Sequence, residues 1–412
     1  MMKITNYQLL IFVFCFFLIV PPFFSTIAEL SYIFGMAQYA ILFSLIFYSV
    51  ILSTYWKVFF SRPAIYFLLF YLVMFVTTYL NNQTIQLCLY DNKSSIALLL
   101  LTVIEMKRHP KEYLKTLSFF NIYQYINLAT IILFPSGLYL SGSYLCWFLG
   151  YKNPMVRIVL PLLLVSIASD MLNKKKLTLK SWCHILCACL CILITKSGTG
   201  LTGLFVFFTI LLIGFHGKKI YKVLFSIKVI YLIILVLVLG LVVYQVHLTN
   251  SFFSSIVENF YGKSTDFTAR TTIWSTSMEL ITEKPIIGYG FMNSSGFAKL
   301  FNYSWSVAHS HNYYFYILLT GGSVLFSVIL AILVYFARTL RKKGYSKMSV
   351  LSVAYLVSLL IMGISESLTE FVMLYASLYM ICIFVKDDNT NFEGEKLTNE
   401  SYQKIAFNKI IL

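Results

Sequence analysis

Two histidines stand within three residues of each other directly before a long apolar run, in the order His309-Ser310-His311-Asn312. The whole chain holds only six histidines, and imidazole is the side chain that titrates near neutral pH. At the edge of an apolar run such a pair suits general acid–base catalysis, and it equally suits the anchoring of a helix end by interfacial polar groups. No metal is expected, because a pair of this spacing needs further ligands.

A cationic and aromatic segment precedes the histidines. Residues 268–283 are predicted to form an amphipathic helix in which Trp274, Met278 and Ile281 share one face. Arg270 lies one turn before Trp274 on the same side, and its guanidinium is a planar fork that matches phosphate oxygens. This helix is expected to lie on the outer membrane surface with its apolar side toward the bilayer, either as part of a site or as a passive cap.

A turn signal follows the predicted helix. Pro285 stops the helix, and Gly288 and Gly290 permit a tight turn that other residues would strain. Tyr289 lies inside this turn and is one of several aromatic residues of the segment. These rings could stack on sugar faces, and they could equally form the aromatic belt of a membrane protein.

The elements that position these residues are membrane helices. The chain has 412 residues, of which 59% are hydrophobic and 12% charged, whereas a soluble domain is about a quarter charged. We predict an all-α polytopic integral membrane protein with about twelve transmembrane helices and one large extracytoplasmic loop. The spans are expected near residues 8–24, 32–53, 63–80, 86–105, 114–135, 156–172, 181–196, 200–215, 223–246, 312–337, 348–366 and 369–385.

Basic residues define the expected topology. The formal net charge is +16, and most Lys and Arg fall in short connections that a twelve-span arrangement puts on one side, with both termini. That side is predicted to be cytoplasmic by the positive-inside tendency, so the charge is no sign of nucleic-acid binding. The chain then divides into nine N-terminal spans (1–246), an extracytoplasmic loop (247–311), three C-terminal spans (312–385) and a cytoplasmic tail (386–412). Cys88 and Cys146 fall near different external loops and could pair.

The order of motifs around the histidines resembles the O-antigen polymerase and O-antigen ligase superfamily of bacterial envelopes. The likeness rests on an Arg with a Trp four residues later, a P-x-x-G-x-G turn, an H-N pair and a Gly-bearing span. These are Arg270, Trp274, Pro285-Ile-Ile-Gly288-Tyr-Gly290, His311-Asn312 and Gly322. The sequence departs from the family pattern near residue 197, where the family often has Arg and the nearest cation here is Lys196.

The resemblance implies a metal-independent glycosyltransferase without a cofactor, whose donor is an oligosaccharide on a polyprenyl diphosphate. By this likeness Arg270 binds the diphosphate, and His311, with His309 as the alternative, accepts a proton from the acceptor hydroxyl. Lys196 and Arg157 would supply further positive charge, and Trp274, Tyr289 and Asn312 would contribute to substrate binding. The implied function is polymerisation of lipid-linked repeat units into capsule, O-antigen or exopolysaccharide.

Two alternatives remain. A ligase of the same superfamily would pass the glycan to a final acceptor, and a lipid-linked oligosaccharide flippase would use a similar number of spans. Transporters commonly show pseudo-repeats and charges at the membrane midplane, whereas here the charges inside the predicted spans are few and no repeat is evident. The expected location is the cytoplasmic (inner) membrane of a bacterium, with the lipid bilayer, a flippase and a chain-length regulator as partners.

Overall fold

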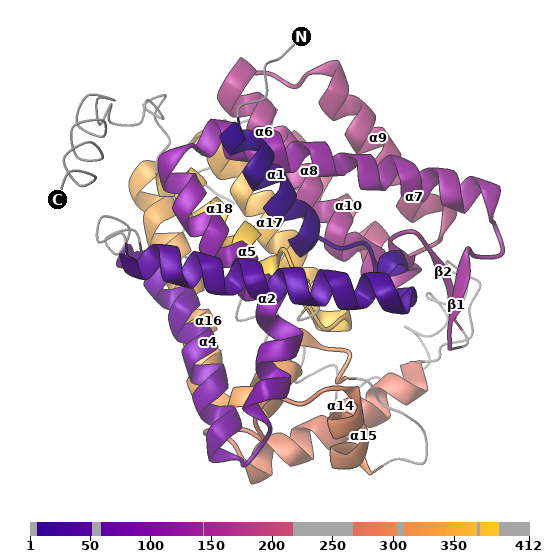
Figure 1. Ribbon diagram of the computed structural model, residues 1–412, viewed down its shortest axis with the longest axis vertical. Coiled ribbons are helices and arrows are strands. Elements are labelled where there is room, and N and C mark those ends of the chain that lie inside the picture. The colour runs from indigo at the N-terminus through magenta and orange to yellow at the C-terminus, as the bar shows by residue number, and fades with distance from the viewer. Residues whose placement is uncertain are drawn as a thin grey trace.

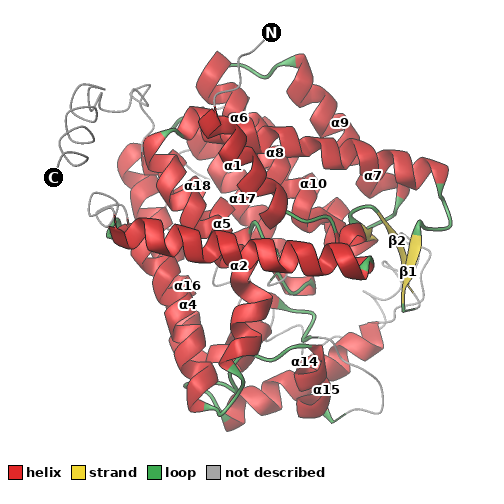
Figure 2. Ribbon diagram, viewed as in Figure 1, coloured by secondary structure: helices red, strands yellow, loops and turns green. Residues whose placement is uncertain are grey.

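The computed structural model describes residues 6–51, 59–142, 144–216, 267–302, 309–368 and 371–386, with the side chains of 51, 216 and 267–271 excepted. The predicted ninth span, the first part of the large loop and nearly all of the tail lie outside these ranges. Within them the chain is mostly helical, as Figure 2 shows.

The helices follow the apolar segments of the sequence. They are α1 (Asn6–Leu18), α2 (Ala28–Ile51), α4 (Arg62–Leu80), α5 (Ile85–Arg108), α6 (Pro110–Ser118), α7 (Ile122–Leu133), α8 (Lys152–Lys174), α9 (Leu179–Ile194), α10 (Gly198–His216), α14 (Phe267–Glu283), α15 (Ser294–Phe301), α16 (Tyr313–Lys343), α17 (Lys347–Ser365) and α18 (Leu374–Lys386). Two short 3₁₀ segments, η1 (Pro22–Thr26) and η2 (Phe119–Asn121), join their neighbours. Figure 1 shows their arrangement.

Seven of the described helices are long and apolar enough to cross a membrane: α2, α4, α5, α8, α10, α16 and α17. Three shorter apolar helices, α1, α9 and α18, lie among them. The chain is therefore a polytopic helical membrane protein, whereas the total of twelve spans stays a prediction.

Close packing fixes the direction of neighbouring helices. A Cβ on Gly203 of α10 would lie 2.3 Å from the sulfur of Met362 in α17, and one on Gly214 would lie 2.4 Å from Val350. Because residue numbers rise along α10 as they fall along α17, the two helices are antiparallel. Small residues let helix backbones approach closely in this way when the surroundings are lipid.

Contacts between side chains of known position also orient other pairs of helices. Tyr66 of α4 packs against Tyr335 of α16, and Thr78, further along α4, bonds to the turn that contacts residues 319–324 of α16, so these two helices are also antiparallel. Arg108 at the end of α5 donates a hydrogen bond to Tyr48, near the end of α2. The basic ends of α4, α5, α16 and α17 therefore share one end of the bundle, as the predicted topology requires of loops on a common side.

The fourth predicted span contains a buried lysine. Lys93 of α5 is buried, its ammonium lies 3.7 Å from the centroid of the Tyr90 ring, and it donates a hydrogen bond to the Tyr90 carbonyl. A cation against an aromatic face is compensated for part of its lost hydration. The fourth span consequently begins at Ile85 and includes Lys93, as the range 86–105 predicts.

The loop between α7 and α8 forms a small antiparallel sheet that the sequence did not reveal. Its strands are β1 (Tyr139–Ser141), β2 (Tyr144–Trp147) and β3 (Gly150–Tyr151), in the order β1-β2-β3. Cys146 lies in β2 and is a free thiol, as is Cys88 in α5, so the two do not form a disulfide in the described structure.

The tenth predicted span is a broken helix. Gly322 interrupts α16 with φ 61° and ψ −159°, a combination open in practice only to glycine. The turn after α14 fills the break: the backbone N–H groups of Tyr289 and Gly290 donate to the carbonyls of Leu319 and Thr320. In return, the N–H groups of Ser323 and Val324 donate to the carbonyls of Pro285 and Ile286. The helix backbone left unpaired by the break is thus satisfied by the turn.

The glycines of this joint have no room for a side chain. A Cβ on Gly322 would lie 2.2 Å from the Ile286 oxygen, and one on Gly288 would lie 2.5 Å from the Leu319 oxygen. The turn also contacts α4, because the N–H of Phe291 donates to the hydroxyl of Thr78. The segment that carries the predicted motif is therefore held on the bundle by main-chain contacts.

Gly322→Ala tests this joint. The added methyl group meets a carbonyl oxygen and forces a strained backbone, so we expect a loss of at least about 2 kcal/mol of folding free energy. The measurement is the thermal unfolding of the purified protein in detergent. Gly35→Ala in α2 is the matched control, since a Cβ added there would meet nothing within 4 Å. Equal unfolding temperatures for the two variants would contradict the role given to the joint.

Candidate active site

Polar side chains from four segments meet at the end of the bundle opposite the basic helix ends. We call this group the polar cluster. It comprises Asn153 and Arg157 of α8, Ser197 and Thr199 beside the start of α10, the segment His309–Asn312 before α16, and Ser365 and Glu366 at the end of α17. The α9–α10 turn, the α17–α18 connection and the segment before α16 are far apart in sequence, so only the fold brings them together.

A buried ion pair joins α8 to the α17–α18 connection. The Arg157 guanidinium lies 3.5 Å from the Glu366 carboxylate, and their side chains are 6% and 7% exposed. The guanidinium also lies 5.8 Å from the centroid of the Phe371 ring. A charge in such surroundings is costly unless it is paired, so each partner requires the other.

Three helices begin at the polar cluster. Ser197, directly before α10, accepts a hydrogen bond from the N–H of Gly200 and donates one to Asn153 in the first turn of α8. Asn312 caps α16 by accepting from the N–H groups of Tyr314 and Phe315. Helix N-termini carry partial positive charge and unpaired N–H groups, which together attract anions.

The end of α17 contacts both the start of α16 and the start of α10. The Asn312 side-chain amide donates to the carbonyl of Ile364, and the hydroxyl of Thr199 lies 3.4 Å from that of Ser365. Asn312 is fully buried, so its side chain serves to fix the start of α16 on α17 in this structure. The histidine next to it is thereby positioned by two helices.

The histidine pair has a defined geometry. The His309 and His311 rings lie 4.2 Å apart between centroids at 62°, and the backbone N–H of His311 donates to Nδ1 of His309. In its neutral form His309 therefore carries its proton on Nε2. His311 has φ 50°, a left-handed conformation that is uncommon for a residue with a side chain. Both imidazoles are partly buried, so neither is a simple surface group.

The helix with the predicted phosphate ligand packs beside the histidines. Trp274 of α14 is 4% exposed and its indole N–H donates to the carbonyl of Ser310, between the two histidines. The indole is thus committed to an internal contact, with the Phe315 ring against it edge to face. Arg270 belongs to the first turn of α14, about 6 Å along the helix axis from Trp274. The side chain of Arg270 lies outside the part of the chain that the structure describes.

Two other predicted site residues are Lys196 and Tyr289. Lys196 is exposed, in a left-handed turn with φ 51°, directly before Ser197. The Tyr289 hydroxyl donates to the Glu283 carboxylate, and burial together with that carboxylate raises the pKa of Tyr289 far above its ordinary value. Tyr289 therefore stays protonated and holds the turn against the end of α14.

The predicted turn is present, with Gly288 at φ 62° and Gly290 at φ 82°, and Pro285 follows the last turn of α14. The residue that sequence reasoning passed over is Glu366. Its signal was an acidic side chain at the end of an apolar span, in a chain with 16 Asp and Glu against 32 Lys and Arg.

One comparison with known proteins gives a match. Residues 183–330 match the model of the family described as O-antigen ligase. This range contains Ser197, Arg270, Trp274, the glycine turn, the histidine pair and the break in α16, and it supports the assignment to the O-antigen polymerase and ligase superfamily. Arg157 and Glu366 lie outside it. Neither a curated protein nor a solved structure matches the chain.

Glu366→Gln tests the buried ion pair. The substitution leaves the Arg157 guanidinium without its neutralising carboxylate, so we expect about 3–5 kcal/mol of destabilisation. The measurement is thermal unfolding in detergent of Arg157→Met, Glu366→Gln and the double variant Arg157→Met/Glu366→Leu.

The double variant should recover most of the stability lost by each single change, because two apolar groups replace two charges. Losses that simply add, or a Glu366→Gln variant as stable as the parent, would show that the two charges do not depend on each other.

Proposed function

We propose that this chain, whose residues 183–330 match the O-antigen ligase family model, transfers a glycan from a polyprenyl diphosphate to an acceptor sugar. The observation that carries the proposal is the position of the histidine pair directly before α16, in the polar cluster where α8 and α10 also begin and where Lys196 precedes Ser197. Such surroundings favour an anion next to a group able to accept a proton.

The reaction divides among the residues as follows. The acceptor hydroxyl attacks the anomeric carbon of the donor sugar, and the bond from that carbon to the diphosphate oxygen breaks. His311 takes the proton of the attacking hydroxyl, and His309 orients His311 through its backbone N–H. The lipid diphosphate leaves with the electron pair of the broken bond, and positive charge near it lowers the barrier.

Arg270 is proposed as the ligand of the diphosphate. Its helix is bound to the segment between the histidines through Trp274, so the main chain of Arg270 lies about one helical turn from that contact. Lys196 and the N-termini of α10 and α16 add further positive charge. Arg157 is buried against Glu366, and its contribution is to hold α8 and its Asn153 in position.

We favour polymerisation of lipid-linked repeat units, with ligation to a final acceptor as the second candidate. The two reactions share the donor and the chemistry and differ in the acceptor. Two features favour the polymerase: the moderate size of the loop from 247 to 311, and the absence of Arg next to Ser197. We place the reaction at the outer face of a bacterial cytoplasmic membrane, with both termini inside.

His311→Ala and Arg270→Ala should each abolish long glycan while the amount of protein in the membrane stays normal. Loss of general base catalysis alone typically costs a factor of about 10²–10⁴ in rate. The measurement is glycan length in cells, and turnover of a defined lipid-linked oligosaccharide by the purified protein. His109→Gln, at the opposite end of the bundle after α5, is the control and should keep activity. Full-length glycan from either alanine variant would overturn the assignment of that residue.

The identity of the accumulated lipid separates the candidate classes. Cells that lack this protein should accumulate single lipid-linked repeat units on the outer face of the membrane if it is a polymerase. Loss of a flippase would instead trap these units on the inner face. The measurement is the accessibility of the lipid-linked unit to a glycosidase added outside spheroplasts. Protection of the unit from the added enzyme would contradict the polymerase proposal.

A further inference from the structure

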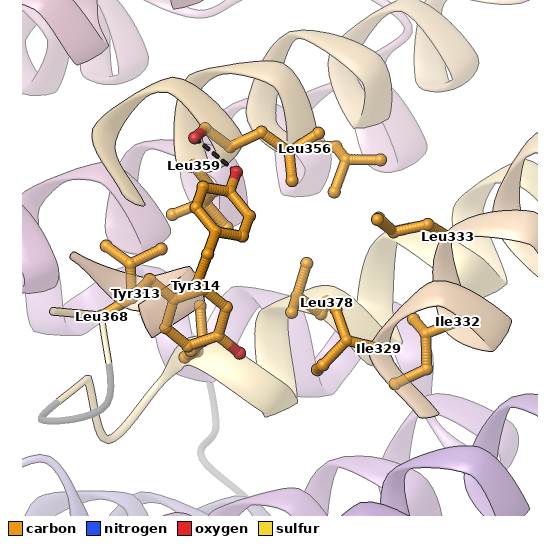
Figure 3. A pocket seen from close by; sticks show the side chains of 11 residues that line it. Tyr313, Tyr314, Ile329, Ile332, Leu333, Leu356, Leu359, Leu368 and Leu378 are labelled. Atoms are coloured by element: carbon orange, nitrogen blue, oxygen red, sulfur yellow. Dashed lines mark hydrogen bonds between the residues drawn. The ribbon is translucent and has the colours of Figure 1, made fainter. Parts of the chain in front are cut away.

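An apolar pocket lies between α16, α17 and α18, beside the polar cluster (Figure 3). About 430 Å³ of space between its walls is unfilled by protein atoms, part of it open to the surroundings. Its walls are Tyr313, Tyr314, Ile329, Ile332, Leu333, Leu356, Leu359, Leu360, Leu368, Leu374 and Leu378.

The pocket offers no polar group to a ligand. The Tyr314 hydroxyl donates to the Leu360 carbonyl, as Figure 3 shows, and the Tyr313 hydroxyl lies 3.3 Å from that of Tyr375. The remaining walls are aliphatic. A buried water molecule needs two or more polar partners, which this pocket lacks. The pocket therefore favours a hydrocarbon ligand over water.

One end of the pocket adjoins the proposed catalytic residues. Tyr313 and Tyr314 follow Asn312 directly, and a Cβ on Gly363 would contact both Tyr313 and Leu368, at 3.3 and 3.4 Å. Glu366 lies in the chain between Gly363 and Leu368, so a wall of the pocket and the ion pair share one connection. Tyr313, which lines the pocket, is two residues after His311 in the sequence.

The other end lies deep in the bundle. Leu356 of α17 is nine residues before the end of that helix at Ser365, which places it about 14 Å below the polar cluster. One leaflet of a bilayer has a hydrocarbon thickness of about 15 Å. The distance from the polar cluster to the far wall of the pocket is therefore comparable to the hydrocarbon thickness of one leaflet.

We infer that this pocket binds the first isoprene units of the polyprenyl chain of the donor, with the diphosphate at the polar cluster. The inference rests on the proposed function. A prenyl chain is bonded to its diphosphate, so it must begin where the diphosphate binds, and the pocket residues Tyr313 and Leu368 lie next to the polar cluster in the chain. An acyl chain of a bilayer lipid has no such tether to the site.

Leu378→Trp tests the inference, because Leu378 lines the pocket from α18 and is only partly buried, so a larger side chain there fills the pocket. The assay compares two donors with the same glycan diphosphate, one on a long polyprenyl chain and one on a dimethylallyl group. For the parent protein the long-chain donor should have a KM lower by on the order of tenfold or more, as expected when several CH₂ groups are buried.

Leu378→Trp should raise the KM of the long-chain donor to that of the short one, with kcat changed little. Ile329→Phe fills the pocket from α16 and should do the same, which guards against a folding defect in the first variant. Leu186→Trp is the matched control, since Leu186 is 61% exposed on α9, outside the pocket, and it should keep the parent preference.

Three results would overturn the inference. One is a full preference for the long chain in both filled variants, and another is no preference in the parent protein. The third is an equal change in the KM of both donors with a lower unfolding temperature, as expected if a bilayer lipid fills the pocket.

Failure of the proposed function looks different, because the parent protein then turns over neither donor. In that event a photoactivatable polyprenyl diphosphate decides the inference by itself. Labelling of α16–α18 peptides that Leu378→Trp abolishes would support it, and labelling elsewhere would overturn it.

Discussion

The contact on which the site depends is the docking of a glycine turn into a broken helix. Four main-chain hydrogen bonds join Pro285, Ile286, Tyr289 and Gly290 to the two sides of the break at Gly322. A helix broken within a membrane protein needs such partners, because lipid cannot satisfy its free N–H and carbonyl groups. The same contact anchors the loop to the bundle, so the helix that carries Arg270 has a fixed position relative to the histidines. Chemistry that requires groups from a loop and from a span depends on this rigidity.

The charges of the site are arranged around that joint in two layers. The inner layer is the Arg157–Glu366 pair, which is neutral overall and ties α8 to the end of α17. The outer layer is positive, made by Lys196 and the helix starts at Gly198 and Tyr313, and it has no matching carboxylate among the described contacts that hold the polar cluster together. An anion that arrives from the membrane surface therefore meets net positive charge, while the buried charge is already compensated.

Much of this organisation follows from the sequence. Apolar length predicts most of the membrane helices, because a bilayer core needs about 20 apolar residues, and seven predicted spans coincide with described helices long enough to cross a membrane. The fifth predicted span, residues 114–135, is instead divided among α6, η2 and α7. The glycine turn and the helix before it also follow from local signals, since Pro285 cannot continue a helix and Gly288 and Gly290 adopt positive φ. Local signals carry this information because they depend on one stretch of chain.

Contacts between segments that are distant in the chain could not be predicted from the sequence. Nothing in the pattern around Gly322 distinguishes a kinked span from a straight one, because the reason for the kink is the carbonyl of Ile286, in another segment. Trp274 and Asn312 were expected to contact substrate, and the structure uses both for internal hydrogen bonds. The partnership of Arg157 with Glu366 joins residues more than 200 positions apart, and a single sequence gives no sign of it.

A structure of the protein with a non-reactive lipid-linked donor would test the central claim most directly. We expect its diphosphate to lie between His311 and the first turn of α14, near the N-termini of α10 and α16. A diphosphate bound at the basic end of the bundle, or away from His311 with α14 on the far side, would contradict the proposed site.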